Sequence, residues 1–230
     1  MKQNLPNVKN LHFAVLATDV ALMTVKDGSL RIRLVPVNRP PHFPLMYGLP
    51  GGLIHPTETA EESALRLIHE KARITSTTIY LEQLYTFSEV NRDPRGRVVA
   101  VAYIALIPWE SLSEEEQADT DDASWVTLTR AHDLAYDHDL ITTTAVTRLR
   151  SRAHYTTILG KLMPSEFTLT DLERVYESIL HTGLDKRNFR KKILNLGVLT
   201  PLNRKRSGGA FRPAQLYRFT SSKVTEIEIL

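Results

Sequence analysis

The spacing of hydrophobic side chains changes along the chain, and each change predicts an element. Residues 30–37 alternate apolar and basic side chains, which is typical of a half-buried strand. The apolar run at 11–25 precedes it across a Lys-Asp-Gly-Ser turn, so the two runs predict a β-hairpin. Residues 78–87 and 98–107 predict two further strands, and 125–128 predicts a short one. The run at 98–107 is apolar almost throughout, so we expect it to be buried on both faces.

Two segments of the same region, 58–72 and 139–155, have the helical period of apolar side chains. Thr59 and Glu62 match a capping box at the start of the first segment. Its expected buried stripe consists of Ala64, Leu65, Ile68 and Ala72. Prolines exclude a helix from residues 38–50. Strands flanked by two helices predict a mixed α/β sandwich.

The last third of the chain has a different pattern. Thr170 and Glu173 predict a capping box at the start of one helix, and Asp185 is a good N-cap for a second helix. The expected buried stripe of the second helix consists of Phe189, Ile193 and Leu196. Residues 198–219 have apolar ends around a basic stretch, which predicts a β-hairpin. Two helices followed by a hairpin describe a winged helix-turn-helix.

These patterns predict an α+β chain of two domains, residues 1–155 and 156–230, and charge separates the two halves as well. The net charge of +3 combines 15 Lys and Arg against 19 Asp and Glu in residues 1–150, or −4, with 14 against 7 in residues 151–230, or +7. A basic domain attached to an acidic one is typical of a nucleic-acid-binding protein. The alternative is a basic tail of no special purpose.

Composition excludes several classes of site. Cysteine is absent, which excludes disulfides, cysteine nucleophiles and zinc–thiolate sites. The N-terminal residues lack the apolar run of a signal peptide, and no apolar stretch approaches the length of a membrane span. We therefore expect a cytoplasmic protein that does not contact a membrane.

Polar side chains of the predicted winged helix suit duplex DNA. In the major groove arginine pairs with guanine and asparagine with adenine, while lysine holds phosphates. The candidate residues on the second helix are Lys186, Arg187, Asn188, Arg190 and Lys191. Those of the hairpin, placed for phosphates or a minor groove, are Arg204, Lys205, Arg206 and Arg212.

The first domain contains a candidate site for a nucleotide. A glycine pair before a helix can present backbone N–H groups to a phosphate, and clustered arginines can clamp a diphosphate. Aromatic rings can stack on an adenine, although core packing is the competing interpretation for each ring. The candidate ligand-binding residues are Arg39, Gly51, Gly52, Glu70, Phe87, Arg92, Asp93, Arg95 and Tyr103.

The segment after the glycine pair resembles the Nudix box, G-x5-E-x7-R-E-U-x-E-E-x-G-U. The matching residues are Gly52, Glu58, Arg66, Ile68, Glu70 and Ile74. Leu67, Lys71 and Arg73 depart from the pattern at two glutamates and a glycine. Magnesium needs several oxygen ligands, but of the two departing glutamate positions one is the apolar Leu67 and the other is the cationic Lys71. We therefore expect no bound metal, no catalytic residues and no hydrolysis.

A degenerate Nudix box followed by a basic winged helix resembles the Nudix-related transcriptional regulators of the NrtR type. Further motifs that carry the resemblance are Tyr85-Thr86-Phe87-Ser88, Arg92-Asp93-Pro94-Arg95-Gly96, Ala135-Tyr136-Asp137-His138 and Asp185-Lys186-Arg187-Asn188-Phe189-Arg190. The resemblance implies a homodimeric bacterial repressor of NAD biosynthesis or salvage genes. It implies that ADP-ribose or a related nucleotide is the effector and that the operator is an inverted repeat of double-stranded DNA. No other cofactor is expected.

Two alternatives to this interpretation remain at this point. One is a Nudix hydrolase of ADP-ribose-type nucleoside diphosphates with a basic accessory domain, and the other is a non-enzymatic RNA-binding module. The first predicts magnesium-dependent release of AMP, and the second predicts equal affinity for duplex DNA and structured RNA.

Overall fold

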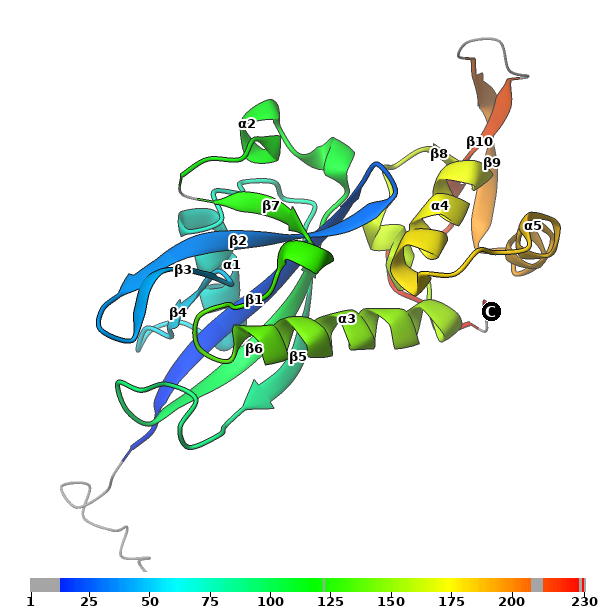
Figure 1. Ribbon diagram of the computed structural model, residues 1–230. Coiled ribbons are helices and arrows are strands. Elements are labelled where there is room, and N and C mark those ends of the chain that lie inside the picture. The colour runs from blue at the N-terminus through cyan, green and yellow to red at the C-terminus, as the bar shows by residue number, and fades with distance from the viewer. Residues whose placement is uncertain (1–12, 122, 208–212, 228, 230) are drawn as a thin grey trace, which may run out of the picture.

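A twisted sheet, a long helix beneath it and a smaller lobe of helices and a hairpin make up the molecule (Figure 1). This computed structural model describes residues 13–121, 123–207, 213–227 and 229. Within these residues, seven strands form the large sheet in the order β3-β2-β1-β6-β5, with β4 paired to β1 and β7 paired to β2. The strands are β1 Val15–Lys26, β2 Ser29–Arg39, β3 Phe43–Gly48, β4 Gly51–Leu53, β5 Tyr80–Phe87, β6 Val98–Leu106 and β7 Ser124–Thr127.

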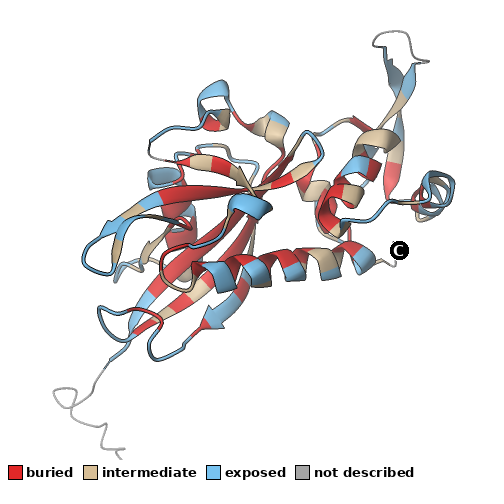
Figure 2. Ribbon diagram, in the orientation of Figure 1, coloured by how far each residue is buried: buried red, intermediate tan, exposed pale blue. Residues whose placement is uncertain are grey.

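The central strands β1 and β6 run parallel, from Val15 opposite Val98 to Met23 opposite Leu106, whereas the other strand pairs of the large sheet are antiparallel. Successive side chains of a strand point to opposite faces. Val20 and Leu22 therefore lie in the core beneath α1 (Ala60–Glu70), whereas the alanine and methionine that follow them pack towards α3 (His138–Tyr155). This arrangement confirms the predicted mixed α/β sandwich, whose buried centre Figure 2 shows in red.

The start of α1 agrees with the sequence pattern, but its buried face differs. The Thr59 N–H donates to Glu62 Oε2 at 2.7 Å, and the Glu62 N–H donates to Thr59 Oγ1 at 3.2 Å, which completes the predicted capping box. The predicted buried stripe is wrong at one residue, because Leu65 is 45% exposed. Leu67 is 1% exposed instead, since it packs under β4.

The proline-rich segment contains a strand that the sequence did not predict. Strand β3 lies at the edge of the sheet and, among the described strands, pairs with β2 alone. An edge strand accepts a proline such as Pro44, because it needs hydrogen bonds to one neighbouring strand instead of two. The acidic segment between β6 and β7 contains two short helical turns, η2 (Trp109–Ser111) and α2 (Glu114–Gln117), and a third turn, η3 (Leu128–Arg130), follows β7. No described helix has both the length and the apolar composition needed to cross a membrane.

The C-terminal lobe has the predicted two helices and hairpin. Its elements are η4 (Ile158–Leu162), β8 (Phe167–Thr168), α4 (Leu169–Leu180), α5 (Lys186–Asn195), β9 (Leu199–Arg206) and β10 (Ala214–Phe219), and β10 lies between β8 and β9. The predicted capping box of α4 is wrong by two residues. Thr168 caps the helix and exchanges hydrogen bonds with Asp171, because the chain leaves strand β8 at Thr168 in an extended conformation.

The two lobes share one hydrophobic core. The predicted domain boundary, between residues 155 and 156, falls where α3 ends. However, the C-terminal segment returns to this point, where the Ile227 N–H donates to Tyr155 O and the Ile229 N–H donates to His154 O, both at 2.8 Å. Buried side chains of α3, α4 and the large sheet belong to one continuous cluster. The winged helix is therefore packed directly onto the sandwich.

Candidate ligand pocket and DNA-binding surface

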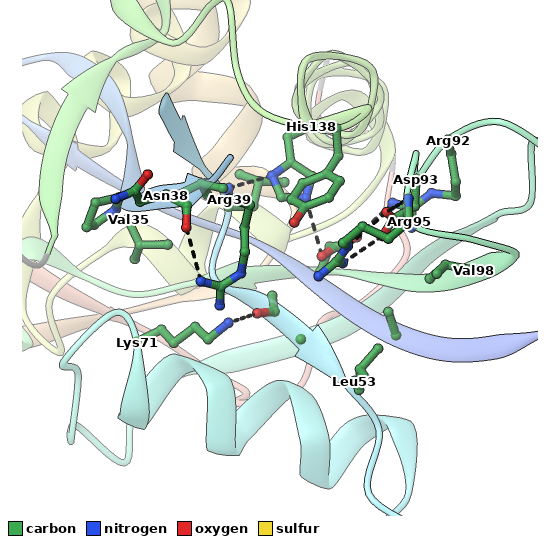
Figure 3. A pocket seen from close by; sticks show the side chains of 18 of the residues that line it. Val35, Asn38, Arg39, Leu53, Lys71, Arg92, Asp93, Arg95, Val98 and His138 are labelled. Carbon is green, nitrogen blue, oxygen red and sulfur yellow. Dashed lines mark hydrogen bonds and ion pairs between the residues drawn. The ribbon is translucent and has the colours of Figure 1, made fainter. Parts of the chain in front are cut away.

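A cavity of about 520 Å³ opens on the sandwich beside the ends of β1, β2, β4 and α1. The loop from Arg92 to Arg95 and the start of α3 complete its wall (Figure 3). Seven of the nine predicted ligand-binding residues line it, namely Arg39, Gly51, Gly52, Glu70, Arg92, Asp93 and Arg95. Residues far apart in the sequence thus meet at one pocket, which also contains Asp19, Lys71, Tyr136 and His138.

The two predicted aromatic residues lie elsewhere. Phe87 belongs to the core cluster on the α3 side of the sheet, and Tyr103 belongs to the cluster on the α1 side. Both are buried, and neither lines the cavity. The aromatic ring that does line it is Tyr136, which has the Arg95 guanidinium 5.2 Å from its centre. Tyr136 was not among the predicted ligand-binding residues, since a single tyrosine before a helix has no distinguishing period.

The prediction that the glycine pair lies at a helix N-terminus is wrong. Gly51 and Gly52 form strand β4 and pair with Asp19 and Thr18 of β1, whereas α1 begins only at Ala60. A Cβ on Gly51 would lie 2.1 Å from Asp19 Oδ1. Glycine is therefore needed here for the close approach of β4 to a carboxylate.

A buried ionic network fixes the floor of the pocket. Arg92 donates to Asp19 Oδ2 at 3.0 Å and to both carboxylate oxygens of Asp137, at 2.8 and 2.5 Å. His138 Nδ1 accepts from the Leu49 N–H at 2.9 Å, so its proton lies on Nε2, 3.4 Å from Asp19 Oδ1. Burial alone would raise the pKa of Asp19, but His138 and Arg92 hold that pKa below its ordinary value. Arg92 thus spends most of its donors inside the protein.

The Arg95 guanidinium is oriented by Asp93 on one side and remains exposed on the other side. Arg95 Nε and Nη2 donate to the two oxygens of Asp93 at 2.9 and 2.7 Å. The Asp93 carboxyl is buried, which would raise its pKa, but the Arg95 hydrogen bonds lower that pKa. Because half of the Arg95 side chain is exposed, it is placed to contact an anionic ligand while Asp93 holds it.

The remaining carboxylates of the Nudix-like helix are bonded to an arginine. Arg66 donates to the two oxygens of Glu58 at 2.9 and 2.6 Å, and to Glu70 Oε2 at 3.1 Å. These hydrogen bonds lower the pKa of Glu58 to about 2. Lys71 turns the other way, and its ammonium donates to the Gly51 carbonyl inside the pocket.

Most of the predicted DNA-binding residues of α5 are exposed, and Figure 2 shows exposed positions of this helix in pale blue. Arg187 and Lys191 are exposed. Asn188 is also exposed, although its amide donates to Asp185 Oδ2 at 3.1 Å as part of the helix cap. The Asp185 side chain accepts from the Asn188 N–H, which confirms the predicted N-cap.

Arg190 and Lys186 make contacts within the lobe. Arg190 Nη2 donates to Thr170 Oγ1 at 2.9 Å and lies 3.3 Å from Glu173 Oε2, and Lys186 Nζ lies 3.1 Å from Glu173 Oε1. The Glu173 side chain is 1% exposed. Both basic side chains therefore neutralise a buried carboxylate of α4 and fix α5 against it.

The hairpin carries its predicted basic residues on β9. Arg204 forms an ion pair with Glu166, Arg206 donates to Asp171 Oδ2 at 2.7 Å, and Lys205 is exposed. The fourth predicted hairpin residue, Arg212, lies outside the described residues.

Sequence comparison identifies the family behind this pairing of a pocket and a basic winged helix. Residues 16–145 match the NUDIX domain, and residues 159–219 match the NrtR DNA-binding winged helix domain. The chain is 36% identical to the ADPR responsive transcriptional repressor NtrR of Acinetobacter baylyi, over 89% of this chain and 82% of that protein. This chain belongs to the NrtR family.

A solved structure of the NrtR family has the same fold over most of this chain. Shewanella oneidensis NrtR in complex with a 27mer DNA is 32% identical, with a TM-score of 0.79 over 89% of this chain and 93% of that one. The NUDIX domain of the same protein in complex with ADP ribose is 32% identical, with a TM-score of 0.52 over 62% of this chain and 93% of that one. Solved structures of this relative thus contain DNA in one case and ADP ribose in the other.

In this NrtR-family chain, helix α3 joins the pocket to the winged helix. His138, its first residue, lines the pocket and belongs to the network of Asp19 and Arg92. An 18-residue helix spans about 27 Å. Near its other end, Arg150 Nε donates to the Ile179 carbonyl of α4 at 2.8 Å. Helix α3 therefore connects the pocket with α4, the helix against which α5 packs.

Proposed function

We propose that this chain is a transcriptional repressor whose Nudix domain binds ADP-ribose or a related nucleotide and whose winged helix then releases its operator. The observation that carries the proposal is the match, over nearly the whole chain, to a repressor described as ADPR responsive. The pocket supports it, because Arg39, Lys71 and Arg95 place cationic groups around one cavity. Such groups suit the two phosphates of a nucleoside diphosphate.

The proposed DNA contacts come from α5 and the wing. Arg187, Asn188 and Lys191 are exposed on α5, and Lys205 is exposed on β9. We propose that the chain binds as a homodimer to an inverted repeat, with the two α5 helices about 34 Å apart. The regulated genes would be those of NAD biosynthesis, and the protein would act in the cytoplasm, where the bacterial chromosome lies.

The proposed regulation is thermodynamic linkage between the two sites. If ADP-ribose favours an arrangement of α3 and α4 that binds DNA poorly, DNA must weaken ADP-ribose binding by the same factor. The hydrolase alternative is less well supported. Arg66 holds Glu58 and Glu70, and the next positions of the box are Leu67 and Lys71. We therefore propose a sensor that does not consume its ligand.

Fluorescence anisotropy tests this proposal. The full chain is titrated onto duplex DNA from its own upstream region and onto a random duplex, at fixed salt, with and without ADP-ribose. Tighter binding to the upstream duplex that weakens with ADP-ribose is the expected result. Magnesium-dependent release of AMP from ADP-ribose, with no preference for the upstream duplex, would favour the hydrolase instead.

A further inference from the structure

The Nudix-like helix does not offer the ligands of a divalent cation. Leu67 occupies one of the carboxylate positions of the box, and its buried side chain packs under Gly52. Arg66 bonds Glu58 and Glu70, so both carboxylates already have a cation. Among the described residues, no group of three or more His, Asp or Glu side chains could hold a metal ion. A hard cation with several oxygen ligands does not fit this donor set.

A basic side chain of the protein occupies this part of the pocket instead. Lys71 stands at the last carboxylate position of the box, and its ammonium donates to the Gly51 carbonyl. That hydrogen bond uses one of its three donors, so two remain for a ligand. Figure 3 shows Lys71 reaching across the pocket towards the side of Arg39. Both side chains line the cavity.

The charges around the cavity point to the same groups. The three acidic side chains of the lining are compensated: Asp19 by Arg92, Asp93 by Arg95 and Glu70 by Arg66. By contrast, the hydrogen bonds of Lys71 and Arg39 go to backbone carbonyl oxygens, which are neutral. Their positive charges therefore remain available to an anion in the pocket.

We propose that the Lys71 ammonium takes the place of a divalent cation, so that the pocket binds a diphosphate group directly and without metal. Lys71 is then a specificity-determining residue for the ligand, with Arg39 and Arg95 on the other phosphate oxygens. The inference rests on the proposed function only in its choice of ADP-ribose as one ligand. The proposed contacts to a diphosphate group do not depend on that choice.

Isothermal titration calorimetry of the full chain tests the inference with two probes. ADP-ribose is titrated in excess EDTA and in excess MgCl2, and inorganic pyrophosphate is titrated in EDTA. Wild-type protein is expected to bind ADP-ribose equally well with and without magnesium. Lys71→Gln should weaken both probes by about tenfold or more, because a charge-assisted contact is lost. Lys71→Glu should bind most weakly in EDTA and recover in part with magnesium, because it restores a carboxylate ligand.

The matched control is Lys223→Gln, which removes the same charge from an exposed position in the C-terminal segment. It should bind both probes like wild type. Unchanged operator affinity of Lys71→Gln shows that this variant is folded, since α5 lies in the other lobe.

Each outcome separates the inference from the proposed function. ADP-ribose binding that needs magnesium, or that Lys71→Gln leaves unchanged, overturns the inference and leaves the effector in place. Metal-free pyrophosphate binding that depends on Lys71, without ADP-ribose binding, refutes the effector and supports the inference. Failure of both probes to bind wild type overturns both.

Discussion

Removing the Arg92 guanidinium should destabilise the protein more than any other single charge change at the pocket. Arg92 is the shared partner of Asp19 and Asp137, and its side chain is 3% exposed. Arg92→Met keeps much of the aliphatic volume and removes the charge and the hydrogen bonds. Two carboxylates would then face a buried site without their cation, and buried charges without a partner are strongly unfavourable.

The size of the effect follows from the exposure of the two carboxylates. Breaking a buried ion pair by removing one partner costs about 3–5 kcal/mol. The Asp19 side chain is 7% exposed but keeps His138, whereas Asp137 is 17% exposed and reaches some water. Both facts place the expected loss at the lower end, about 3 kcal/mol, which is a large part of the ~5–15 kcal/mol that stabilises a typical domain.

Urea unfolding followed by circular dichroism measures this loss, with Arg97→Met as the control from the same loop. Arg97 is exposed, and within the described residues its side chain bonds only the backbone carbonyls of Ser88 and Glu89, so its loss should cost under about 1 kcal/mol. In the double variant with Asp19→Asn, part of the Arg92→Met deficit should disappear, because one uncompensated charge is gone.

The pH dependence gives an independent check with a defined sign. In wild type the folded pKa of Asp19 is lowered, so its contribution to stability is present at neutral pH and is lost as the pH falls below about 4. In Arg92→Met the buried Asp19 carboxyl loses its arginine partner, so burial favours its protonated form, which reverses the sign. The deficit relative to wild type should therefore shrink as the pH falls from 7 towards 5. A deficit equal to that of Arg97→Met, or one that is constant with pH, refutes the reasoning.

Three further predictions concern other parts of the molecule. Arg190→Ala should lower the free energy of unfolding in urea by about 1–3 kcal/mol, because it leaves the buried Glu173 with one cation fewer. Arg187→Ala should change that free energy by no more than about 0.5 kcal/mol and weaken DNA binding. Equal stabilities of the two variants would contradict the internal role of Arg190. Gly51→Ala should destabilise the protein by about 1–3 kcal/mol, because its Cβ would lie 2.1 Å from a carboxylate oxygen. Gly183→Ala should be nearly neutral, because no described neighbouring atom lies within 4 Å of its Cβ. The reverse order of stabilities in thermal melts would refute the close-approach argument. Arg150→Ala should leave ADP-ribose affinity unchanged but reduce the coupling to DNA by about 0.5–2 kcal/mol, measured by anisotropy at saturating ADP-ribose; an unchanged coupling would remove this hydrogen bond from the route.

Periodicity predicted the elements of this fold well because each element buries one face. The hairpin of β1 and β2, the twofold burial of β6 and the helix pair α4 and α5 all follow from it. It failed where a neighbour in space decides the outcome. Leu67 is buried because β4 passes over it, and β3 forms because an edge position accepts Pro44.

The candidate site was predictable in composition but not in its internal bonding. The motif residues around the box and the loop do gather at one cavity. However, nothing in the sequence pairs Arg92 with Asp19, which lies 73 residues away, or Arg190 with Glu173 on another helix. An arginine in a motif can contact a ligand or neutralise a buried acid. Only the three-dimensional neighbours distinguish these two roles, and here Arg95 and Arg187 are the accessible ones.

The internal bonding also suits the proposed regulation. A ligand can shift an equilibrium only by its difference in affinity for the two states, so a sensor needs contacts that move with the rest of the protein. The floor of this pocket is built on His138 and Asp137, at the start of α3, rather than on α1 alone. On the proposed function, a diphosphate bound near Lys71 and Arg95 would change the electrostatic field around the Arg92 network, which holds the start of α3. On the same proposal, the replacement of two box glutamates by Leu67 and Lys71 would leave the ligand uncleaved, and its binding free energy would be available to move α3.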